Sequence, residues 1–568
     1  MTAELSRGIL ISDFNADNLA ALLNQPEEPP ALQVTPAPFG QVYQLLADGE
    51  HPLWAGAPGF ALVWTRPEGV IRAFQSALDY EQPPLSAILE EVDAYAALLR
   101  EAAARVKALL VPTWSLPPFQ RGYGLLDMRP GLGLAHLLME MNLRLAQRLE
   151  PAGNAYLLDA QRWIEAAGWR STPPKLWYMG KIAFGVEVYK QAARDIKASL
   201  QALAGRTRKL VVLDLDDTLW GGIVGDDGWE NLVLGGHSPA GEAFLDFQRS
   251  LKAITRRGIL LGIVSKNSEA VALEAFEKHP EMFLRLDDFA GWKINWGDKA
   301  QNLADLAHEL NLGLDAVVFL DDNPVERARV AEMLPEVLVP DWPEDKTRYK
   351  QALLSLTCFD SPALSQEDAR RTQMYVTERK RSAWKAQAGS LDDWLVGLEI
   401  RVSAGLLDKT NLPRAAQLFN KTNQMNLSTR RMSAEELAAW AGRPENQVWV
   451  LRVADKFGDS GLTGILGLQL TPGRFEITDF VLSCRVMGRK VEETMAALSV
   501  QVARRHGASQ VLAVYRPTAR NQPCLEFWER SGFACQNQVE FTWDTSQEYP
   551  VPGPVRFSLE NQPAAQDA

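Results

Sequence analysis

The sequence has few cysteines and no segment that could cross a membrane. Only four of its 568 residues are cysteine, and no two of them have C-x-x-C spacing: Cys358, Cys484, Cys524 and Cys535. A set this sparse excludes a disulfide framework, so we expect reduced thiols. No apolar run approaches the roughly 18 residues that a transmembrane helix needs, and the N-terminus lacks a basic start followed by an apolar stretch. These absences predict a soluble, cytoplasmic protein with no membrane partner.

The chain also has fewer basic than acidic residues. The chain carries 59 Lys and Arg against 71 Asp and Glu, a formal net charge of -12, which argues against nonspecific binding of nucleic acid. What is present is the composition of an ordinary folded protein, with 46% hydrophobic and 23% charged residues. The length suggests three or four domains of about 150 residues each.

Changes in pattern along the chain predict four parts. They are an N-terminal α/β domain (1–204), a second α/β domain (205–345), a charged helical connector (346–390) and a mixed α/β domain that ends in a frayed tail (391–568). In the second domain, predicted strands at 209–213, 259–264 and 316–320 alternate with helices, one of them near 241–256, which indicates a parallel sheet. In the last domain, helices at 411–420 and 489–505 accompany five strand candidates: "LEIRVSAG", "QVWVLRVADKFG", "LTGILGLQL", "RFEITDFVLSC" and "SQVLAVYRP". The predicted fold class is therefore α/β throughout.

Carboxylates crowd the end of the first strand of the second domain. In "KLVVLDLDDTLWGGIVGDDG" an aliphatic run stops at Asp214, and Asp216, Asp217 and Thr218 follow. Further polar residues stand at comparable places: Ser265 ends a strand, Lys299 begins a helix, and Asp321 and Asp322 end the strand "AVVFLDD". Open α/β sheets bind ligands at the carboxyl ends of their strands, so we expect these side chains to meet.

The chemistry of that set suits phosphoryl transfer. Carboxylates from two strands can hold a hard cation such as Mg²⁺, while a Ser hydroxyl and a Lys ammonium hold phosphate oxygens. Asp214 is then placed to attack phosphorus, and Asp216 to protonate the leaving oxygen and later activate water. A reading as helix caps and turn residues fits Asp217 and Thr218 singly but not the whole set. Lys293 is an alternative to Lys299.

The order D-x-D-x-T, Ser, Lys and DD resembles the haloacid dehalogenase superfamily of aspartyl-phosphate phosphohydrolases. The resemblance implies that Thr218, Ser265 and Lys299 bind phosphate. It also implies that the metal is held by Asp214, by the backbone carbonyl of Asp216 and by an acidic residue of the last motif; the choice between Asp321 and Asp322 stays open. Only 51 positions separate Asp214 from Ser265, and "GGIVGDDGWENLVLGG" looks like a small hairpin flap. Without a large cap, the site should admit a bulky or protein-borne substrate.

The C-terminal domain has a second signature. "SCRVMGRKVEETMAALSVQVARRHGA" resembles the GNAT acetyltransferase superfamily, whose Q/R-x-x-G-x-G/A turn offers backbone amides to the pyrophosphate of acyl-CoA. Arg485, Gly488 and Arg489 match that turn, but Lys490 stands where the last small residue belongs. A side chain there would obstruct pyrophosphate, whereas Arg489 and Lys490 suit the single phosphate of a phosphopantetheine arm.

Cys484 directly precedes this turn. A helix N-terminus and the neighbouring Arg485 should favour its thiolate, which can hold an acyl group. For the other three cysteines we expect buried structural roles.

Several motifs together resemble the FkbH-like family of glyceryl transferase/phosphatases: "DLDDTLWGGIVGDDG", "NWGDKAQN", "FLDDNPVERA", "LFNKTNQMNLSTRR", "DKFGDSGLTG" and "SCRVMGR". The resemblance implies that D-1,3-bisphosphoglycerate loses both phosphates, that Cys484 holds the glyceryl group as a thioester, and that a phosphopantetheinylated acyl carrier protein receives it for polyketide extender units. Mg²⁺ would be the cofactor. Polar residues of "KTNQMN" would then line the acyl site: Lys421, Asn423, Gln424 and Asn426. A basic landing patch for the carrier would consist of Arg430, Arg431, Arg485, Arg489 and Lys490.

The first 200 residues say less about function than the rest of the sequence. "ILISDFNADNLAALL" resembles a degenerate SGNH-hydrolase opening block with Ser12 after a strand, but Arg162 stands three positions after Asp159 where that family has His. We therefore expect a docking or structural domain, with four aromatic residues packing at a domain interface: Trp163, Trp169, Trp177 and Tyr178.

Two alternatives to the transferase/phosphatase hypothesis stay open. One is a plain Mg²⁺-dependent phosphatase of polysaccharide or lipid biosynthesis whose GNAT-like domain only binds. The other is an acyl-CoA-dependent acyltransferase with an inactive phosphatase domain, which Lys490, Cys484 and the intact carboxylate set disfavour.

Overall fold

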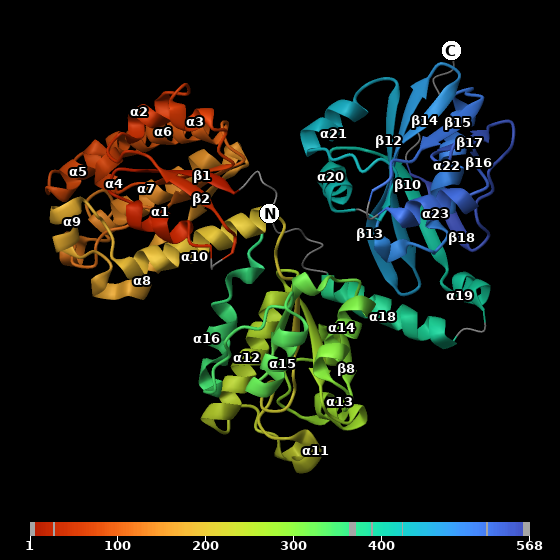
Figure 1. Cartoon of the computed structure of the whole chain (residues 1–568), viewed down its shortest axis with the longest axis horizontal. Helices are drawn as coiled ribbons and strands as arrows, with labels where there is room; N and C mark the ends of the chain where they lie inside the picture. The colour runs from red at the N-terminus through yellow and green to blue at the C-terminus, as the bar shows by residue number, and fades with distance from the viewer. Residues whose placement is uncertain are drawn as a thin grey trace. The chain divides into compact units, whose positions relative to one another are not determined.

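The computed structural model describes residues 6–26, 29–362, 371–387, 390–422, 424–518 and 521–560. The chain forms two compact units, one of residues 1–286 with 292–369 and the other of residues 287–291 with 370–568. The first unit contains two parallel sheets and the second contains one mixed sheet (Figure 1). The predicted α/β fold class is confirmed.

The first sheet has the order β2-β1-β3-β4-β5, and every pairing is parallel. Its strands are β1 (Arg7–Ser12), β2 (Gln33–Pro36), β3 (Phe60–Trp64), β4 (Ala108–Pro112) and β5 (Ala155–Leu158). Successive residues of β1 enter different cores, Ile9 and Ile11 on one face and Leu10 on the other. A sheet buried on both faces needs strands that are apolar at nearly every position, which is what "GILIS" and "FALVW" provide.

Helices cover both faces of this sheet (Figure 1). On the face of Ile9 pack α2 (Val42–Ala47), α5 (Arg72–Leu78), α6 (Leu85–Ala103) and α7 (Leu134–Leu149). On the face of Leu10 pack α1 (Asp17–Leu23), α8 (Ala160–Ala167) and α10 (Val186–Leu203).

The second sheet has the order β8-β7-β6-β9. Its strands are β6 (Leu210–Leu213), β7 (Leu260–Ser265), β8 (Phe289–Ile294) and β9 (Val317–Leu320). The central strand β6 runs parallel to both β7 and β9. The chain passes from β6 to β7 and β8 and then returns to β9 on the other side of β6. The topological switch point, where such sheets bind ligands, therefore lies between β6 and β9.

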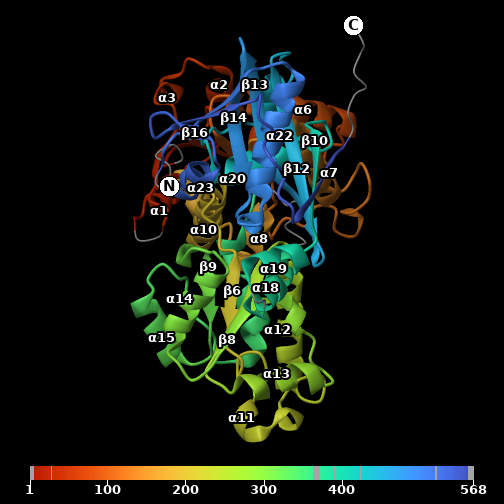
Figure 2. The same ribbon diagram turned by 90° about the vertical axis from the view of Figure 1, so that its right-hand side faces the viewer.

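Helices flank the second sheet on two sides, and Figure 2 shows α14 and α15 on one side and α12 on the other. The helices of this part are α12 (Pro239–Thr255), α13 (Glu269–Lys278), α14 (Lys299–Glu309) and α15 (Pro324–Met333). The strands predicted from the sequence are confirmed to within one residue, and the helix predicted near 241–256 is α12.

The segment between β6 and α12, all of which the structure describes, is short and contains no cap domain. It holds one helical turn, α11 (Val224–Asp227), and a 3₁₀ turn, η5 (Trp229–Asn231). Gly221 and Val233 form an antiparallel bridge across its base, with N to O distances of 3.0 and 2.8 Å. The flap is thus largely helical, although the sequence suggested a hairpin.

The third sheet is mixed, with the main order β16-β17-β15-β14-β13-β12-β10-β18. Its strands are β10 (Ile400–Leu406), β11 (Met425–Asn426), β12 (Asn446–Asp455), β13 (Gly458–Thr471), β14 (Arg474–Leu482), β15 (Gln510–Val514), β16 (Ala534–Cys535), β17 (Glu540–Asp544) and β18 (Val555–Leu559). The helices are α18 (Arg371–Gln387), α19 (Leu391–Gly397), α20 (Leu412–Lys421), α21 (Ala434–Ala441), α22 (Val491–Arg505) and α23 (Gln522–Arg530). The five predicted strands and the two predicted helices are confirmed, whereas the short strands β11, β16, β17 and β18 were not predicted.

Among the described residues, no helix combines the length and the apolar character needed to cross a membrane.

Candidate active site

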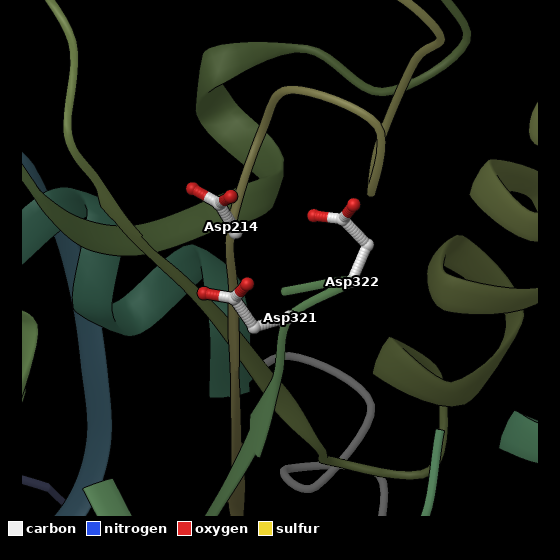
Figure 3. A group of neighbouring side chains, drawn as sticks. All are labelled: Asp214, Asp321 and Asp322. Carbon is white, nitrogen blue, oxygen red and sulfur yellow. The ribbon is translucent and has the colours of Figure 1, made fainter. Parts of the chain in front are cut away.

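Three carboxylates meet at the switch point of the second sheet (Figure 3). Asp214 follows β6, and its backbone N–H continues the strand ladder by donating to Leu320 O at 3.0 Å. Asp321 and Asp322 follow β9. Each of the three offers one oxygen, and these oxygens lie within 4.8 Å of one another. The sheet register alone therefore brings together acids that are about a hundred positions apart in the sequence.

Lys299, the first residue of α14, neutralises part of this charge. Its Nζ lies 2.6 Å from Asp321 Oδ2 and 3.1 Å from Asp214 Oδ2. Burial alone would lower the pKa of Lys299, but the two carboxylates outweigh it and raise that pKa, so the side chain stays an ammonium ion. Asp298 caps α14 by accepting from Gln301 N at 3.1 Å, which fixes the first turn that carries the lysine. Lys293, the alternative in the sequence, pairs instead with Glu309 at 2.5 Å.

Ser265 and Thr218, both predicted to bind phosphate, are buried at the same edge. The Ser265 hydroxyl hydrogen-bonds to the Asp214 carboxylate. The Thr218 hydroxyl accepts the backbone N–H of Asp322 at 3.0 Å and so ties the loop after β6 to the loop after β9. Thr218 thus positions the acidic residues in this structure, and Ser265 lies next to the predicted nucleophile.

The Asp216 carboxylate is outside the three-acid cluster and is held by three donors. Its Oδ1 accepts from Trp220 Nε1 at 3.0 Å and Val224 N at 3.1 Å, and its Oδ2 accepts from Asn267 Nδ2 at 2.8 Å. Burial raises the pKa of Asp216 despite these bonds, which suits a general acid. Asn267 is not among the site residues predicted from the sequence. Its position two residues after Ser265, at the carboxyl end of β7, was the available signal.

The donor set fits a hard divalent cation. All three ligands are carboxylates, one of them half-buried and two almost fully buried, which is the oxygen chemistry that Mg²⁺ prefers. Burial raises the pKa of Asp214 and raises that of Asp321 to about 6, with the neighbouring Asp214 charge adding to the second shift. The two lysines that pair with these three acids, Lys299 and Lys346, leave part of the negative charge uncompensated, and a bound cation would neutralise it.

In the second unit, the "KTNQMN" segment lies beside the end of β14. Strand β11 pairs with β14 so that Met425 is opposite Leu482 and Asn426 is opposite Val481. Residue 423 and the side chains of Lys421 and Cys484 lie outside the described residues. The backbone places this segment next to the turn that begins at Cys484, as the acyl-site hypothesis requires.

The remaining predicted residues of this segment differ in exposure. Gln424 is exposed. Asn426 is fully buried, and its amide is engaged within the loop, donating to Thr422 O at 3.1 Å and accepting from Thr429 N at 2.8 Å. In this arrangement Asn426 shapes the loop, and Gln424 is accessible to a ligand.

The turn before α22 is occupied by the chain's own side chains. Gly488 has φ +72° and Lys490 has φ +64°, a left-handed conformation that small residues adopt most easily. The Gly488 N–H donates to Glu492 Oε1 at 2.6 Å, and Glu492 is 2% exposed. One backbone amide of the matched turn is therefore already paired with a carboxylate.

The predicted basic patch is partly internal. Arg489 is 3% exposed and pairs with Glu378 at 2.5 Å and with Asp455 at 3.4 Å. Arg430 pairs with the buried Asp479, and Arg485 donates to Ser483 Oγ at 3.2 Å. Lys490 is half-exposed beside Glu493. These pairs reduce the positive charge that this surface presents to an acidic partner.

The first sheet has a cavity of about 420 Å³ at its own switch point, lined among others by Asp13, Tyr43 and Arg66. Ser12 is buried there, and its hydroxyl donates to Phe14 O at 2.5 Å. Asp159 caps α8 by accepting from Arg162 N at 3.4 Å. Both residues are therefore engaged in contacts within their own domain, and its docking or structural role stays a prediction.

Among the aromatic residues expected at an interface, Trp163 instead packs within the core of this domain against Trp64, with ring centroids 5.2 Å apart. Trp169 and Tyr178 are 77% and 80% exposed.

Burial was expected for three cysteines, but only Cys524 is buried: Cys358 is half-buried, and Cys535 is exposed, so the expectation for Cys535 was wrong. The three therefore differ in predicted reactivity. Burial raises the pKa of both Cys358 and Cys524 to about 12, so at pH 8 only about one part in 10⁴ of either is the nucleophilic thiolate. We expect iodoacetamide at pH 8 to leave both unmodified in the folded protein while it alkylates the exposed Cys535. Peptide mass spectrometry after brief treatment measures this, and rapid labelling of Cys524 would contradict the structure.

The fold is similar to that of a solved phosphatase domain that binds a metal. The solved structure is the N-terminal part of protein BF1531 from Bacteroides fragilis, which contains this phosphatase domain complexed with Mg. It is 26% identical to this chain, with a TM-score of 0.58 over 63% of this chain and 94% of that one.

Several matches that cover about a quarter of this chain are acetyltransferases. The ribosomal-protein-S18-alanine N-acetyltransferase from Escherichia coli is 11% identical (TM-score 0.20; 24% of this chain, 79% of that one). A mutant of the spermidine N-acetyltransferase SpeG from Vibrio cholerae is 14% identical (TM-score 0.21; 26% and 94%). No family model and no curated protein matched the chain.

Proposed function

We propose that this protein is a bifunctional enzyme that removes the phosphates of D-1,3-bisphosphoglycerate and transfers the glyceryl group through Cys484 to the phosphopantetheine thiol of an acyl carrier protein. The observation that carries the proposal is the cluster of Asp214, Asp321 and Asp322 with Lys299 at the switch point. The similarity to a Mg-complexed phosphatase domain supports the phosphatase half of the proposal. The transferase half rests on the motifs around Cys484.

In the phosphatase step the chain's own residues bind, attack and move protons. The Asp214 carboxylate forms a bond to phosphorus while the phosphorus bond to the ester oxygen breaks, and Asp216 gives that oxygen its proton. Asp216 then takes a proton from the water that hydrolyses the aspartyl phosphate, releasing inorganic phosphate. Lys299 and Ser265 stabilise the charged phosphoryl oxygens. Mg²⁺, held by Asp214, the Asp216 carbonyl and Asp321 or Asp322, would supply further charge neutralisation when bound.

In the transferase step an activated acyl phosphate needs only a nucleophile. The Cys484 thiolate forms a bond to the acyl carbon while the carbon bond to the phosphate oxygen breaks. The carrier thiol, losing its proton to solvent, then takes the acyl group and returns Cys484 as a thiolate. Because the described segment between β6 and α12 forms no cap domain, that segment would not exclude a substrate tethered to protein from the phosphatase site. Gln424, which is exposed beside β11, would contact the acyl group.

Phosphate release from D-1,3-bisphosphoglycerate in the presence and absence of Mg²⁺, with intact-protein mass spectrometry, tests the proposal. We expect Mg²⁺-dependent release of the second phosphate together with a glyceryl adduct on the protein, because displacement of the first phosphate by Cys484 needs no metal. Release from simple monoesters without any adduct would favour the plain phosphatase with a noncatalytic C-terminal unit.

Binding of Mg²⁺ should weaken as the pH falls. Because burial raises the pKa of Asp321 to about 6, this carboxyl is mostly protonated below pH 6 and must lose its proton to bind a cation. The raised pKa of Asp214 acts in the same direction. Competition with one proton makes the Mg²⁺ dissociation constant roughly tenfold larger at pH 5 than at pH 7. Calorimetric titrations at the two values measure this, and equal affinities would show that the cation does not use these carboxylates.

A further inference from the structure

A second lysine lies beside the three-acid cluster. Lys346 belongs to a 3₁₀ turn, η8 (Lys346–Arg348), far along the chain from the strand-end motifs. Its Nζ donates to Asp217 O at 2.8 Å and to Tyr349 Oη at 2.9 Å, and it lies 3.4 Å from Asp322 Oδ2. The Lys346 side chain is 26% exposed, so it is held largely inside the protein.

One contact of Lys346 fixes an unfavourable backbone conformation. Asp217 has φ +53°, the left-handed region that residues with a side chain seldom adopt. Its carbonyl accepts from Lys346 and, at 3.3 Å, from the Tyr349 hydroxyl. Such a conformation persists when surrounding contacts hold it. It determines where the neighbouring Asp216 carbonyl and the Thr218 hydroxyl point.

The other contact of Lys346 is with Asp322, the most exposed acid of the cluster. Asp322 is 27% exposed at its side chain, more than Asp214 or Asp321. Its backbone is fixed by Thr218 and by Arg327, which donates to Asp322 O at 2.7 Å. Lys346 is the cation nearest its carboxylate among the ion pairs of the described residues. It therefore links the loop after β6 to the loop after β9 at the point where a cation would bind.

We propose that Lys346 is a positioning residue of the cation site, which holds Asp322 and the left-handed turn at Asp217 in the arrangement that binds Mg²⁺. This inference rests on the proposed phosphatase function and extends it to a residue outside the D-x-D-x-T, Ser, Lys and DD set. Tyr349 contributes by orienting the ammonium: its ring is fully buried against Phe244, Phe247 and Trp342, so its hydroxyl is a fixed acceptor.

The test compares Mg²⁺ binding by the full-length wild type with that of Lys346→Met and a matched control, Lys350→Met. Lys350 lies four residues later, is 50% exposed and pairs with Asp246 at 3.0 Å, away from the acids. Tyr349→Phe is a milder variant that removes only the hydroxyl. We expect Lys346→Met to weaken Mg²⁺ binding in calorimetry about tenfold, the size typical for a residue that orients metal ligands. Tyr349→Phe should lose less Mg²⁺ affinity than Lys346→Met, and Lys350→Met should keep the Mg²⁺ affinity of the wild type.

Kinetics separate positioning from a direct catalytic role. With p-nitrophenyl phosphate, Lys346→Met should need about tenfold more Mg²⁺ for half-maximal rate, while kcat at saturating Mg²⁺ returns close to that of the wild type. Unchanged Mg²⁺ affinity in both Lys346→Met and Tyr349→Phe would overturn the inference, as would an equal loss in Lys350→Met. If the wild type itself bound no Mg²⁺, the proposed phosphatase function would fail as well.

Discussion

Replacing Asp214 with asparagine should reduce phosphate release from simple monoesters such as p-nitrophenyl phosphate by on the order of 10³-fold or more. The neutral amide keeps the size of the side chain but cannot attack phosphorus and is a poor cation ligand. Because Asp214 is buried beside Lys299 at 3.1 Å, the substitution also removes a partner of that ammonium. Initial rates with a phosphate assay at saturating Mg²⁺ measure the loss.

A matched control is Asp246→Asn. Asp246 lies on α12 within the same domain, but its side chain is 39% exposed and pairs with Arg249 and Lys350 at the surface. Surface pairs of this kind contribute little to stability, so the control should keep its activity and its melting temperature. A folded Asp214→Asn variant that retains more than about a tenth of the wild-type rate would assign the chemistry to another residue.

Replacing Cys484 with alanine should abolish the glyceryl adduct and all transfer to a carrier protein. The reason is that alanine has no atom that can hold the acyl group. Phosphate release from p-nitrophenyl phosphate should stay within about twofold of the wild type, since the phosphoryl-transfer residues belong to the other compact unit. Intact-protein mass spectrometry and the phosphate assay, run on the same preparation, measure the two activities separately.

Cys535→Ala provides the control for this prediction, because Cys535 is an exposed free thiol. It should leave adduct formation unchanged. An adduct that persists in Cys484→Ala but disappears in Cys535→Ala would place the acyl group on the wrong residue for this mechanism.

The strand-end carboxylates were predictable because local sequence determines where β6 and β9 stop. In each case an aliphatic run indicates the strand, and the aspartate that stops the run marks its end: Asp214 for β6 and Asp321 for β9. The parallel arrangement then follows from alternation of strands with helices. The pairing of β6 with β9, which puts these acids side by side, is a consequence of that arrangement.

The supporting residues were harder to predict because their contacts depend on tertiary structure. Asn267 reaches Asp216 across 51 positions, and Lys346 reaches Asp217 across 129. Lys346 has no local pattern that distinguishes it from an ordinary polar residue of a loop, and the one signal for Asn267 is its position two residues after Ser265. Likewise Arg489 follows a turn glycine and looks like a ligand-binding residue, yet the buried carboxylate of Asp455 and the nearby Glu378 bind it. Strand β11, only two residues long, is defined by its pairing with β14.

The central claim is that a phosphatase site and an acyl-carrying cysteine act in succession on one substrate. The most direct test is the intact mass of Asp214→Asn after incubation with D-1,3-bisphosphoglycerate and Mg²⁺. Because this variant should lose the phosphatase step and keep the thiol, the account predicts a phosphoglyceryl adduct on Cys484 that persists, where the wild type carries a glyceryl adduct. A variant that shows no adduct, or one that carries the dephosphorylated glyceryl group, would contradict the assignment of Asp214 and Cys484 to consecutive steps on one substrate.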